Sequence, residues 1–493
     1  MKIGKTFALF FYFALGASLL LAQSEPPNLV LTGKILGSQN KTYFEVPFDV
    51  PKGTHRISVD FSYTGRDQKT TLDLGIADPE RFRGNSGGNK SHFTIGESDA
   101  TPSYLPGPIL AGRWKLLVSV PNIRPQVEAT YRVEIRFNNP SEDHGFASAP
   151  LETGVRWYRG DLHMHTAHSD GSCLSQSGKR VPCPLFFTAQ TASQRGLDFI
   201  AITDHNATSQ YEPMRELQPY FDRLLLIPGR EITTFWGHFN IFGITQHIDY
   251  RVALGGRDVN AILREVRDQG GIASFNHADA PDGEICMGCA WRPQTPIDMS
   301  LFAGVEVING RLSSADVWDR ELAKGFRLTA IGGSDNHNAL KPAGEPGAIG
   351  SPETVIEASE LSVPAILDGI RHGRAFIDLT SSHDKVVDME ARDTAMDHAA
   401  NDPWTFMGGT VTAGSGDSIA FRIRLSACPD ATVHLFLDGH ETPAIAPLLT
   451  KSGDETLPFA WTSDGGRHWV RIEVRDANGG VMLVSNPIYI NFN

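Results

Sequence analysis

The chain has 493 residues, which is more than one hydrophobic core usually organises, so we expect two to four domains. Its composition, 41% hydrophobic and 20% charged, argues against a disordered chain and against a multi-pass membrane protein. A net charge of -13 without a basic run argues against sequence-independent binding to a polyanion, although a bound cation would still let a small phosphorylated substrate bind.

The N-terminus has the pattern of a secretory signal. Lys2 and Lys5 precede an apolar run over residues 7–22, and a polar segment containing Pro26 follows. The run is shorter than the roughly twenty residues that a membrane-spanning helix needs. We therefore expect residues 1–22 to be removed and the mature protein to be periplasmic or secreted, without stable membrane insertion. An uncleaved membrane anchor is the alternative.

Two β-rich regions flank the chain's centre. Residues 28–138 contain short alternating runs, such as residues 56–61, separated by clusters of Gly, Pro, Asn and Asp. Similar runs return after residue 385, for example at residues 468–474. We therefore predict an antiparallel β-sandwich for residues 23–148 and a second, Ig-like β-sandwich for residues 385–493.

The central part alternates short apolar runs with amphipathic stretches. Asp258 can cap a helix that ends near Gly270, and Ser362 can cap another that ends near Gly373. Repeated strand and helix units predict a parallel sheet, and their number predicts a barrel over residues 149–384. The expected fold class is thus multidomain α/β plus all-β, with a barrel flanked by two sandwiches.

Five cysteines are present: Cys173, Cys183, Cys286, Cys289 and Cys428. In an oxidising compartment the first two and the next two could each close a small loop, leaving Cys428 unpaired. A zinc knuckle at Cys286-Met-Gly-Cys289 is the alternative, but no second pair has the same spacing, so we favour structural bridges.

Histidines concentrate in the predicted barrel, where eight of the 17 lie between residues 163 and 337 and most follow a predicted strand. They are His163, His165, His168, His205, His238, His247, His277 and His337, accompanied by Asp170, Asp204, Glu231 and Asp335. The carboxyl ends of barrel strands meet in space, so these side chains are expected to converge. Imidazole and carboxylate suit zinc, manganese or iron, and a bridging carboxylate can hold two ions close together.

Six motifs over about residues 155–380 resemble the polymerase and histidinol phosphatase (PHP) superfamily, and more narrowly its exported branch named after carbaryl hydrolases. They are Gly160-Asp-Leu-His163-Met-His165, Thr203-Asp-His205, Gly229-Arg-Glu231, Gly237-His238, Asn276-His277 and Gly333-Ser-Asp335-Asn-His337. The resemblance implies a distorted (β/α)7 barrel that binds two or three divalent transition-metal ions.

The resemblance also implies a ligand set for each ion. One ion would be held by His163, His165, Glu231 and Asp335. Glu231 would bridge to a second ion, held with His238 and His277. A third would be held by Asp170, His205 and His337; many relatives have histidine at the first of these positions, and the carboxylate occurs among trinuclear phosphoesterases.

Four further residues are candidates for catalysis or substrate binding. Asp204 could orient His205 or accept a proton, and His168 could donate one. Arg230 could contact a substrate anion, and Asn206 could hydrogen-bond to substrate. A purely structural role is the alternative for each of them. His247 matches no motif and is expected to have no function in the site.

We therefore predict an exported metal-dependent hydrolase that attacks a small-molecule substrate with a metal-bridging hydroxide. A phosphoesterase acting on phosphomonoesters, phosphodiesters or nucleotides is the leading hypothesis. Hydrolysis of a carbamate, carboxyl ester or amide is the alternative, because the same hydroxide attacks either centre. A non-catalytic carbohydrate-binding or adhesive module is a hypothesis from another class. The sequence does not predict the oligomeric state.

Overall fold

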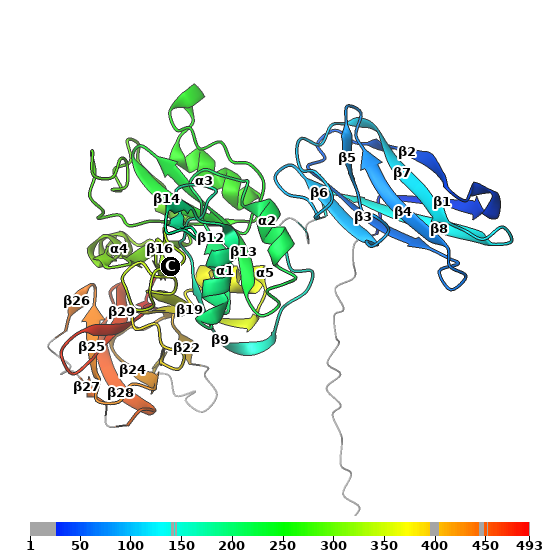
Figure 1. Ribbon diagram of the computed structural model, residues 1–493. Coiled ribbons are helices and arrows are strands. Elements are labelled where there is room, and N and C mark those ends of the chain that lie inside the picture. Colours follow the sequence, from blue (N-terminus) through cyan, green and yellow to red (C-terminus); the bar gives the residue numbers. More distant parts are fainter. Residues whose placement is uncertain are drawn as a thin grey trace, which may run out of the picture.

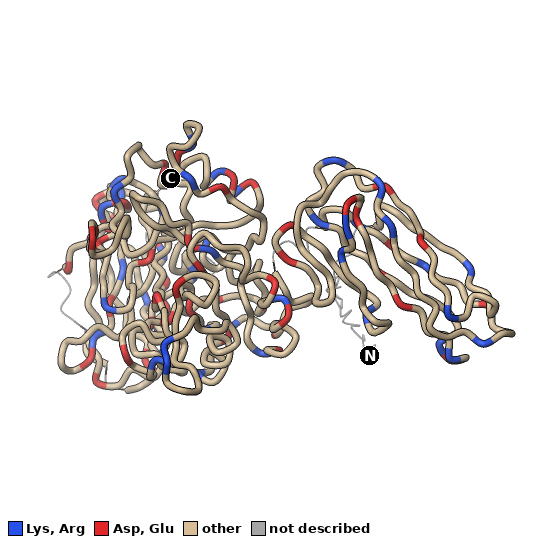
Figure 2. Tube along the Cα trace, turned by 45° about the horizontal axis from the view of Figure 1, so that its top comes forward, with Lys and Arg blue, Asp and Glu red and all other residues tan. Residues whose placement is uncertain are grey.

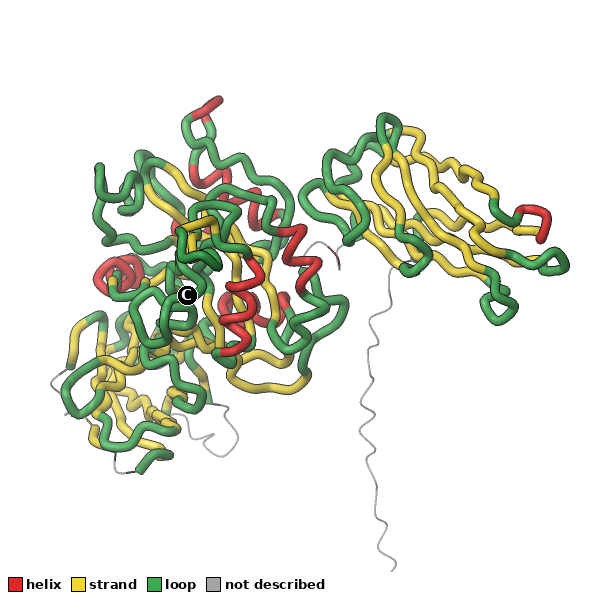
Figure 3. Tube along the Cα trace, in the orientation of Figure 1, coloured by secondary structure: helices red, strands yellow, loops and turns green. Residues whose placement is uncertain are grey.

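The computed structural model describes residues 26–139, 142, 145–394, 404–442, 448–450 and 452–492, so the predicted signal segment lies outside the described residues. Strands dominate the structure (Figure 3), and the α-helices of the described residues, as distinct from the short 3-10 helices, all lie between residues 185 and 371. Acidic and basic residues are mixed along the trace (Figure 2). Within the described ranges, no helix combines the length and apolar character that a membrane crossing requires.

The N-terminal region consists of two four-stranded antiparallel sheets around one apolar core. Their strand orders are β1-β8-β3-β6 and β2-β7-β4-β5. Buried and exposed residues alternate along β8, which is typical of a strand with one face on the core. The strands are β1 (Leu29–Leu36), β2 (Thr42–Val50), β3 (Arg56–Tyr63), β4 (Thr71–Ala77), β5 (Phe82–Asn85), β6 (His92–Gly96), β7 (Gly112–Asn122) and β8 (Glu128–Phe137).

Seven strands of the central region close into a ring. Four neighbouring pairs are parallel: β9 with β12, β12 with β13, β15 with β16, and β16 with β18. A parallel bridge between Met164 and Asn336 joins the ends of β9 and β18 and completes the ring. The strands are β9 (Thr153–Asp161), β12 (Phe199–Ile202), β13 (Leu225–Thr234), β14 (Gly237–Phe242), β15 (Ile272–Phe275), β16 (Gly304–Asn309) and β18 (Thr329–Gly333).

Helices cover the ring only in part, because no α-helix lies between β13 and β14 or between β15 and β16, so the predicted alternation of strand and helix is wrong at these two connections. A tight turn joins β13 directly to β14, which pairs antiparallel with both β13 and β15. Gly237 closes that turn with a φ of 142°, a conformation that favours glycine. The helices are α1 (Leu185–Gln194), α2 (Tyr211–Leu217), α3 (Val259–Asp268), α4 (Ala315–Ala323) and α5 (Val363–Arg371).

Two of these helices begin where the sequence indicates. The Asp258 carboxylate accepts a hydrogen bond from the backbone N–H of Ala261 at 2.7 Å and caps α3. The Ser362 hydroxyl accepts one from Ala365 at 3.4 Å and caps α5. The apolar faces of both helices are buried, which fixes them against the ring.

The C-terminal region is joined to the central region by continuous strand pairing. Strand β20 (Ala375–Asp378), which pairs with β19 (Glu353–Glu360), also pairs antiparallel with β30 (Val481–Ser485). The second sheet of this region has the order β22-β21-β24-β28. The remaining strands are β21 (Val386–Asp393), β22 (Thr405–Phe406), β23 (Thr410–Val411), β24 (Ser415–Ser426), β25 (Thr432–Leu437), β26 (His440–Glu441), β27 (Leu448–Leu449), β28 (Glu455–Asp464), β29 (His468–Arg475) and β31 (Ile488–Ile490).

The N-terminal region lies beside α2 of the central region (Figure 1). Asp99 is fully buried between two arginines, Arg56 of β3 and Arg215 of α2. The Arg56 guanidinium also donates to Thr245 of the central region at 3.1 Å. Removing one member of this group would leave an uncompensated buried charge, so it fixes how the two regions meet.

Candidate metal centre

Eight of the nine predicted ligands lie in strands of the ring or in the segments that follow them, and Asp170 lies in the loop between β9 and β10 (Ser172–Leu174). His163 and His165 follow β9, His205 follows β12, and His277 follows β15. Glu231 lies in β13 and His238 in β14, while Asp335 and His337 follow β18. All nine fall into four overlapping groups in which the candidate ligand atoms lie within 4.8 Å of one another. The structure therefore brings together every residue that the motifs indicate.

Glu231 is the hub of the inner part of the cluster. Its buried carboxylate oxygens lie 2.8–3.5 Å from one nitrogen each of His163, His165, His205, His238 and His277. His205 is therefore as close to Glu231 as the other imidazoles are. The predicted assignment of His205 to the third ion alone is too narrow, because it lies between the two parts of the cluster.

Asp335 is a second carboxylate that contacts several of the imidazoles. Its Oδ1 lies 3.1 Å from Nε2 of His165 and 3.4 Å from Nε2 of His163. Asp335 and His277 both have a left-handed backbone, with φ of 51° and 25°. Strained non-glycine residues of this kind persist where the surrounding structure holds them, and they cluster at functional sites.

Asp170 belongs to the solvent-facing part of the cluster. Its carboxylate lies 3.3 Å from Nε2 of His337, 3.7 Å from Nε2 of His205 and 3.9 Å from Nδ1 of His165. The side chain of Asp170 is 56% exposed and that of His337 is 39% exposed, whereas that of Glu231 is 1% exposed. An ion held here would be the one most accessible to substrate and solvent.

The donor atoms fit divalent cations. The buried Nε2 of His163, both ring nitrogens of His238 and Nδ1 of His277 have no hydrogen-bond partner among the described residues. Unsatisfied buried polar atoms are rare, and an ion is one of their ordinary explanations. Nitrogen and carboxylate donors together suit zinc, manganese or iron.

Mutual neutralisation governs the charges of the cluster. Burial alone would raise the pKa of Glu231, but His163, His205 and His238 hold it well below its usual range. Burial likewise opposes protonation of His163, yet Glu306, Asp335 and Glu231 raise its pKa well above the usual value. The carboxylates are therefore ionised, and cations would take the place of protons on the imidazoles.

Glu306 of β16 is a functional candidate that the motifs missed. Its Oε1 lies 2.9 Å from Nδ1 of His163, and its Oε2 accepts from the backbone N–H of His277 and the side chain of Asn309. A carboxylate on the far nitrogen of a ligand histidine orients the ring and raises its basicity. The available signal was a glutamate inside the apolar run of residues 305–308.

Asp204 holds the loop that carries Asp170, rather than the imidazole of His205. Its oxygens accept from the Thr166 backbone at 2.7 Å, the Thr166 hydroxyl at 2.7 Å and the Ser169 hydroxyl at 2.6 Å. The Asp204 carboxylate is fully buried, and both of its oxygens are already hydrogen-bonded in these contacts. We therefore describe Asp204 as a positioning residue, which corrects the predicted catalytic role.

The predicted substrate contact of Arg230 is also wrong. Adjacent residues of a strand point to opposite faces, so Arg230 points away from the cluster that Glu231 faces. Its guanidinium is fully buried and donates to the backbone oxygen of Gln246 at 2.7 Å and to the Tyr211 hydroxyl at 3.3 Å. Arg230 therefore stabilises the packing of α2 against β13.

Asn206 and His168 have local partners. The Asn206 amide donates to the Thr233 carbonyl at 3.0 Å and accepts from the Thr233 N–H at 3.0 Å, so it extends the pairing of β12 with β13. That contact replaces the predicted one to substrate. His168 is half-buried, and its Nδ1 lies 2.8 Å from the Ser209 hydroxyl. His247 belongs to none of the four groups.

A pocket of about 430 Å³ adjoins the outer ligands Asp335 and His337. Its walls include Arg180 of β11 (Arg180–Pro182), which pairs with β10 (Ser172–Leu174), and Lys341 of the loop after β18. The Arg180 Nε donates to Ser172 at 2.8 Å, and no described residue accepts from its terminal nitrogens. Cys173 and Cys183 are paired and fix this hairpin beside the cluster.

No family model matches the chain, and no curated protein matches it either. Among solved structures, it is similar to a two-domain protein from Bacteroides vulgatus containing a predicted PHP-like metal-dependent phosphoesterase. That match has a TM-score of 0.38 and 20% identity, and covers 68% of this chain and 96% of that one. The CARDB domain of a Pyrococcus furiosus protein matches with a TM-score of 0.12 and 11% identity, over 22% of this chain and 99% of that one. Both TM-scores are below 0.5, so neither likeness decides the fold or the function.

Proposed function

We propose that the protein is a metal-dependent hydrolase of the PHP type that cleaves small phosphate esters. The observation that carries this proposal is the convergence of nine imidazole and carboxylate ligands around Glu231, next to a pocket with two cationic side chains. Divalent ions bound there would lower the pKa of a water molecule and offset charge on the ester oxygens.

The chain's own residues would orient and bind. Glu306 fixes the ring of His163 through a 2.9 Å contact, and Asp204 holds the loop that presents Asp170. His168 is half-buried and lies two residues before Asp170 in the chain, and its imidazole would donate a proton to a leaving oxygen. Arg180 and Lys341 add positive charge on the open side, which attracts an anionic substrate.

Those two cations favour a phosphate ester over the alternative, a neutral carbamate or carboxyl ester. A neutral acyl substrate has no charge for them to bind, whereas a phosphate monoester carries about two negative charges near neutral pH.

The pairs Cys173–Cys183 and Cys286–Cys289 support export of the protein, since structural disulfides persist in oxidising compartments.

The test uses the full chain supplied with zinc, manganese or iron and compares 4-nitrophenyl phosphate with a 4-nitrophenyl carbamate. We expect turnover of the phosphate, and a KM for it that rises about tenfold or more, or about 1.4 kcal/mol, in Arg180→Ala with Lys341→Ala. Lys179→Ala, on the same hairpin but outside the pocket, is the matched control. Turnover of the carbamate alone would overturn the phosphoesterase proposal.

A further inference from the structure

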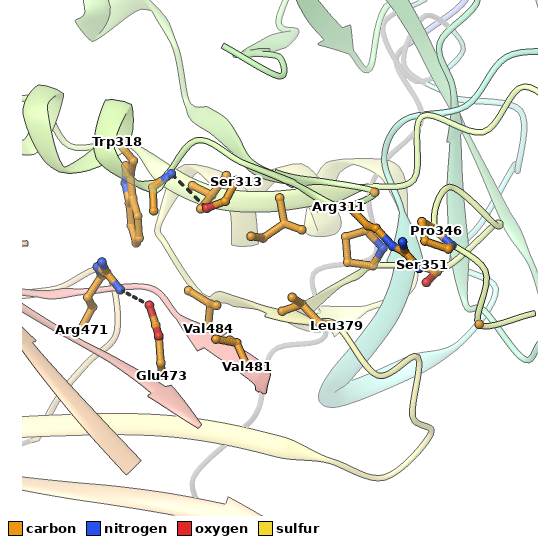
Figure 4. Close-up of a pocket in the computed structure, with 16 residues that line it drawn as sticks. Arg311, Ser313, Trp318, Pro346, Ser351, Leu379, Arg471, Glu473, Val481 and Val484 are labelled. Atoms are coloured by element: carbon orange, nitrogen blue, oxygen red, sulfur yellow. Dashed lines mark hydrogen bonds and ion pairs between the residues drawn. The ribbon is translucent and has the colours of Figure 1, made fainter. Parts of the chain in front are cut away.

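A second pocket lies between the ring and the C-terminal strands. It has a volume of about 540 Å³ and is lined by residues of β16, α4, β29 and β30 and by the loop after β18 (Figure 4). Glu306 of β16 faces the metal cluster, whereas its neighbour Val307 lines this pocket. The pocket is therefore separate from the metal cluster and lies on the other side of β16.

Apolar side chains form the middle of this pocket. Figure 4 shows Leu379, Val481 and Val484 along one wall, between two polar ends. Trp318 of α4 lies at one of those ends. A volume of several hundred Å³, an apolar stretch with a few polar groups at its ends and a place between packed regions are typical of small-molecule sites.

One polar end is already neutralised by the protein. The Arg471 guanidinium lies 3.0 Å from the Asp319 carboxylate and 3.1 Å from the Glu473 carboxylate, and it stacks over the Trp318 ring. Its side chain is only 3% exposed. This end therefore offers a ligand little unbalanced charge.

The other end carries an unbalanced positive charge. Figure 4 shows Arg311 beside Pro346 and Ser351. Arg311 is exposed, and none of the described residues accepts a hydrogen bond from it or forms an ion pair with it. It lies in the turn between β16 and β17 (Leu312–Ser313), two residues after Asn309.

We propose that this pocket binds a small amphipathic anion, with its apolar chain along Leu379, Val481 and Val484 and its anionic head group on Arg311. The guanidinium can donate two parallel hydrogen bonds to a carboxylate or phosphate oxygen pair. Binding at Arg311 would also affect the metal cluster through Asn309. This residue precedes the Gly310–Arg311 turn and donates to Glu306 at 3.0 Å and to Asp335 at 3.4 Å.

The test measures binding by titration calorimetry on the full chain, without relying on turnover. Octanoate has the chain and the charge, octylammonium has the chain with the opposite charge, and acetate has the charge without the chain. We expect saturable binding of one octanoate per chain, and at least tenfold weaker binding of the other two. Arg311→Ala should weaken octanoate binding at least tenfold.

Two further variants separate loss of the site from loss of the fold. Val481→Trp, at a half-buried position of the wall, should fill the pocket and abolish octanoate binding. Arg113→Ala, an exposed arginine of the N-terminal region, should leave binding unchanged. Absence of saturable octanoate binding to the wild type, or equal affinity in Arg311→Ala, would overturn the proposal.

Discussion

The Oε1 atom of Glu306 lies 2.9 Å from Nδ1 of His163, so the other ring nitrogen of His163 points to Glu231 and Asp335. Because this contact fixes the orientation and basicity of the ring, we expect Glu306→Gln to weaken metal affinity about 10- to 100-fold. Competition with a fluorescent chelator measures this. Glu345→Gln, an exposed glutamate outside the cluster, is the control. Equal affinities for the two variants would show that Glu306 does not orient His163.

Glu231→Gln should lower the hydrolytic rate at least about a hundredfold while the fold survives. The amide keeps the shape of the side chain, but it removes the negative charge that faces five imidazoles. Steady-state kinetics, circular dichroism and elemental analysis together check this. Full activity with unchanged metal content would mean that another group is the hub of the cluster.

Asp170→Ala should lower the metal content by about one ion per chain and leave the ions around Glu231 in place, because the nearest contact of Asp170 is with the exposed His337, at 3.3 Å. Activity should fall more for a phosphate monoester than for a neutral aryl carbamate, since the ester's charge needs the extra cation in the transition state. Elemental analysis with both substrates measures this. Equal losses on the two substrates would contradict this role.

Metal binding should release protons. Burial opposes protonation of His163, His205 and His277, but neighbouring carboxylates raise the pKa of all three above the ordinary value, so without an ion these imidazoles keep their protons to a higher pH than free imidazoles do. A cation must displace those protons, so affinity should fall as the pH is lowered. Calorimetric titration with zinc in two buffers of different ionisation enthalpy counts the protons. No difference between the buffers would mean that the imidazoles bind as neutral rings.

Glu353 should make the wild type less stable as the pH rises. Burial raises its pKa to about 8, although Arg159 at 3.1 Å opposes the shift. Between the ordinary carboxyl pKa and 8, the folded state keeps a proton that the unfolded state has lost, so the free energy of unfolding falls across that range. Glu353→Gln lacks this titrating proton. Its free energy of unfolding, relative to that of the wild type, should therefore rise by on the order of 1 to 3 kcal/mol between pH 5.5 and 8.5. Urea unfolding of both proteins at the two pH values measures the difference. A constant difference would contradict the raised pKa.

The clustering of the nine candidate ligands could be predicted from sequence because their chemistry is distinctive and because strand ends converge in a ring. His163 and His165 are two residues apart and share a face, whereas Arg230 and Glu231 are adjacent and therefore face opposite sides of a strand. Applied consistently, the strand period of two would have placed Arg230 on the opposite face of β13. The prediction for Arg230 was wrong because it relied on the neighbouring position of Glu231 in the sequence, although the strand period already indicated the opposite face.

Other features had no local signal that decided their role. From the sequence alone, the glutamate in this apolar strand could face either solvent or His163. Only the assembled ring reveals the role of Glu306. The absence of a helix between β13 and β14 depends on a four-residue turn that ends at Gly237, and one glycine does not specify a turn. The pairing of Phe376 with Ser485 joins positions more than one hundred residues apart, which periodicity cannot detect.

That last pairing has a consequence for dissecting the molecule. Strand β20 has β19 on one side and β30 on the other, and Val355 and Phe376 belong to the same apolar core as the C-terminal strands. Ending the chain near residue 385 would expose the backbone groups of an edge strand beside uncovered apolar side chains, a template for aggregation. We therefore expect the metal-binding region to melt together with the C-terminal strands in one transition, and to be insoluble when expressed without them.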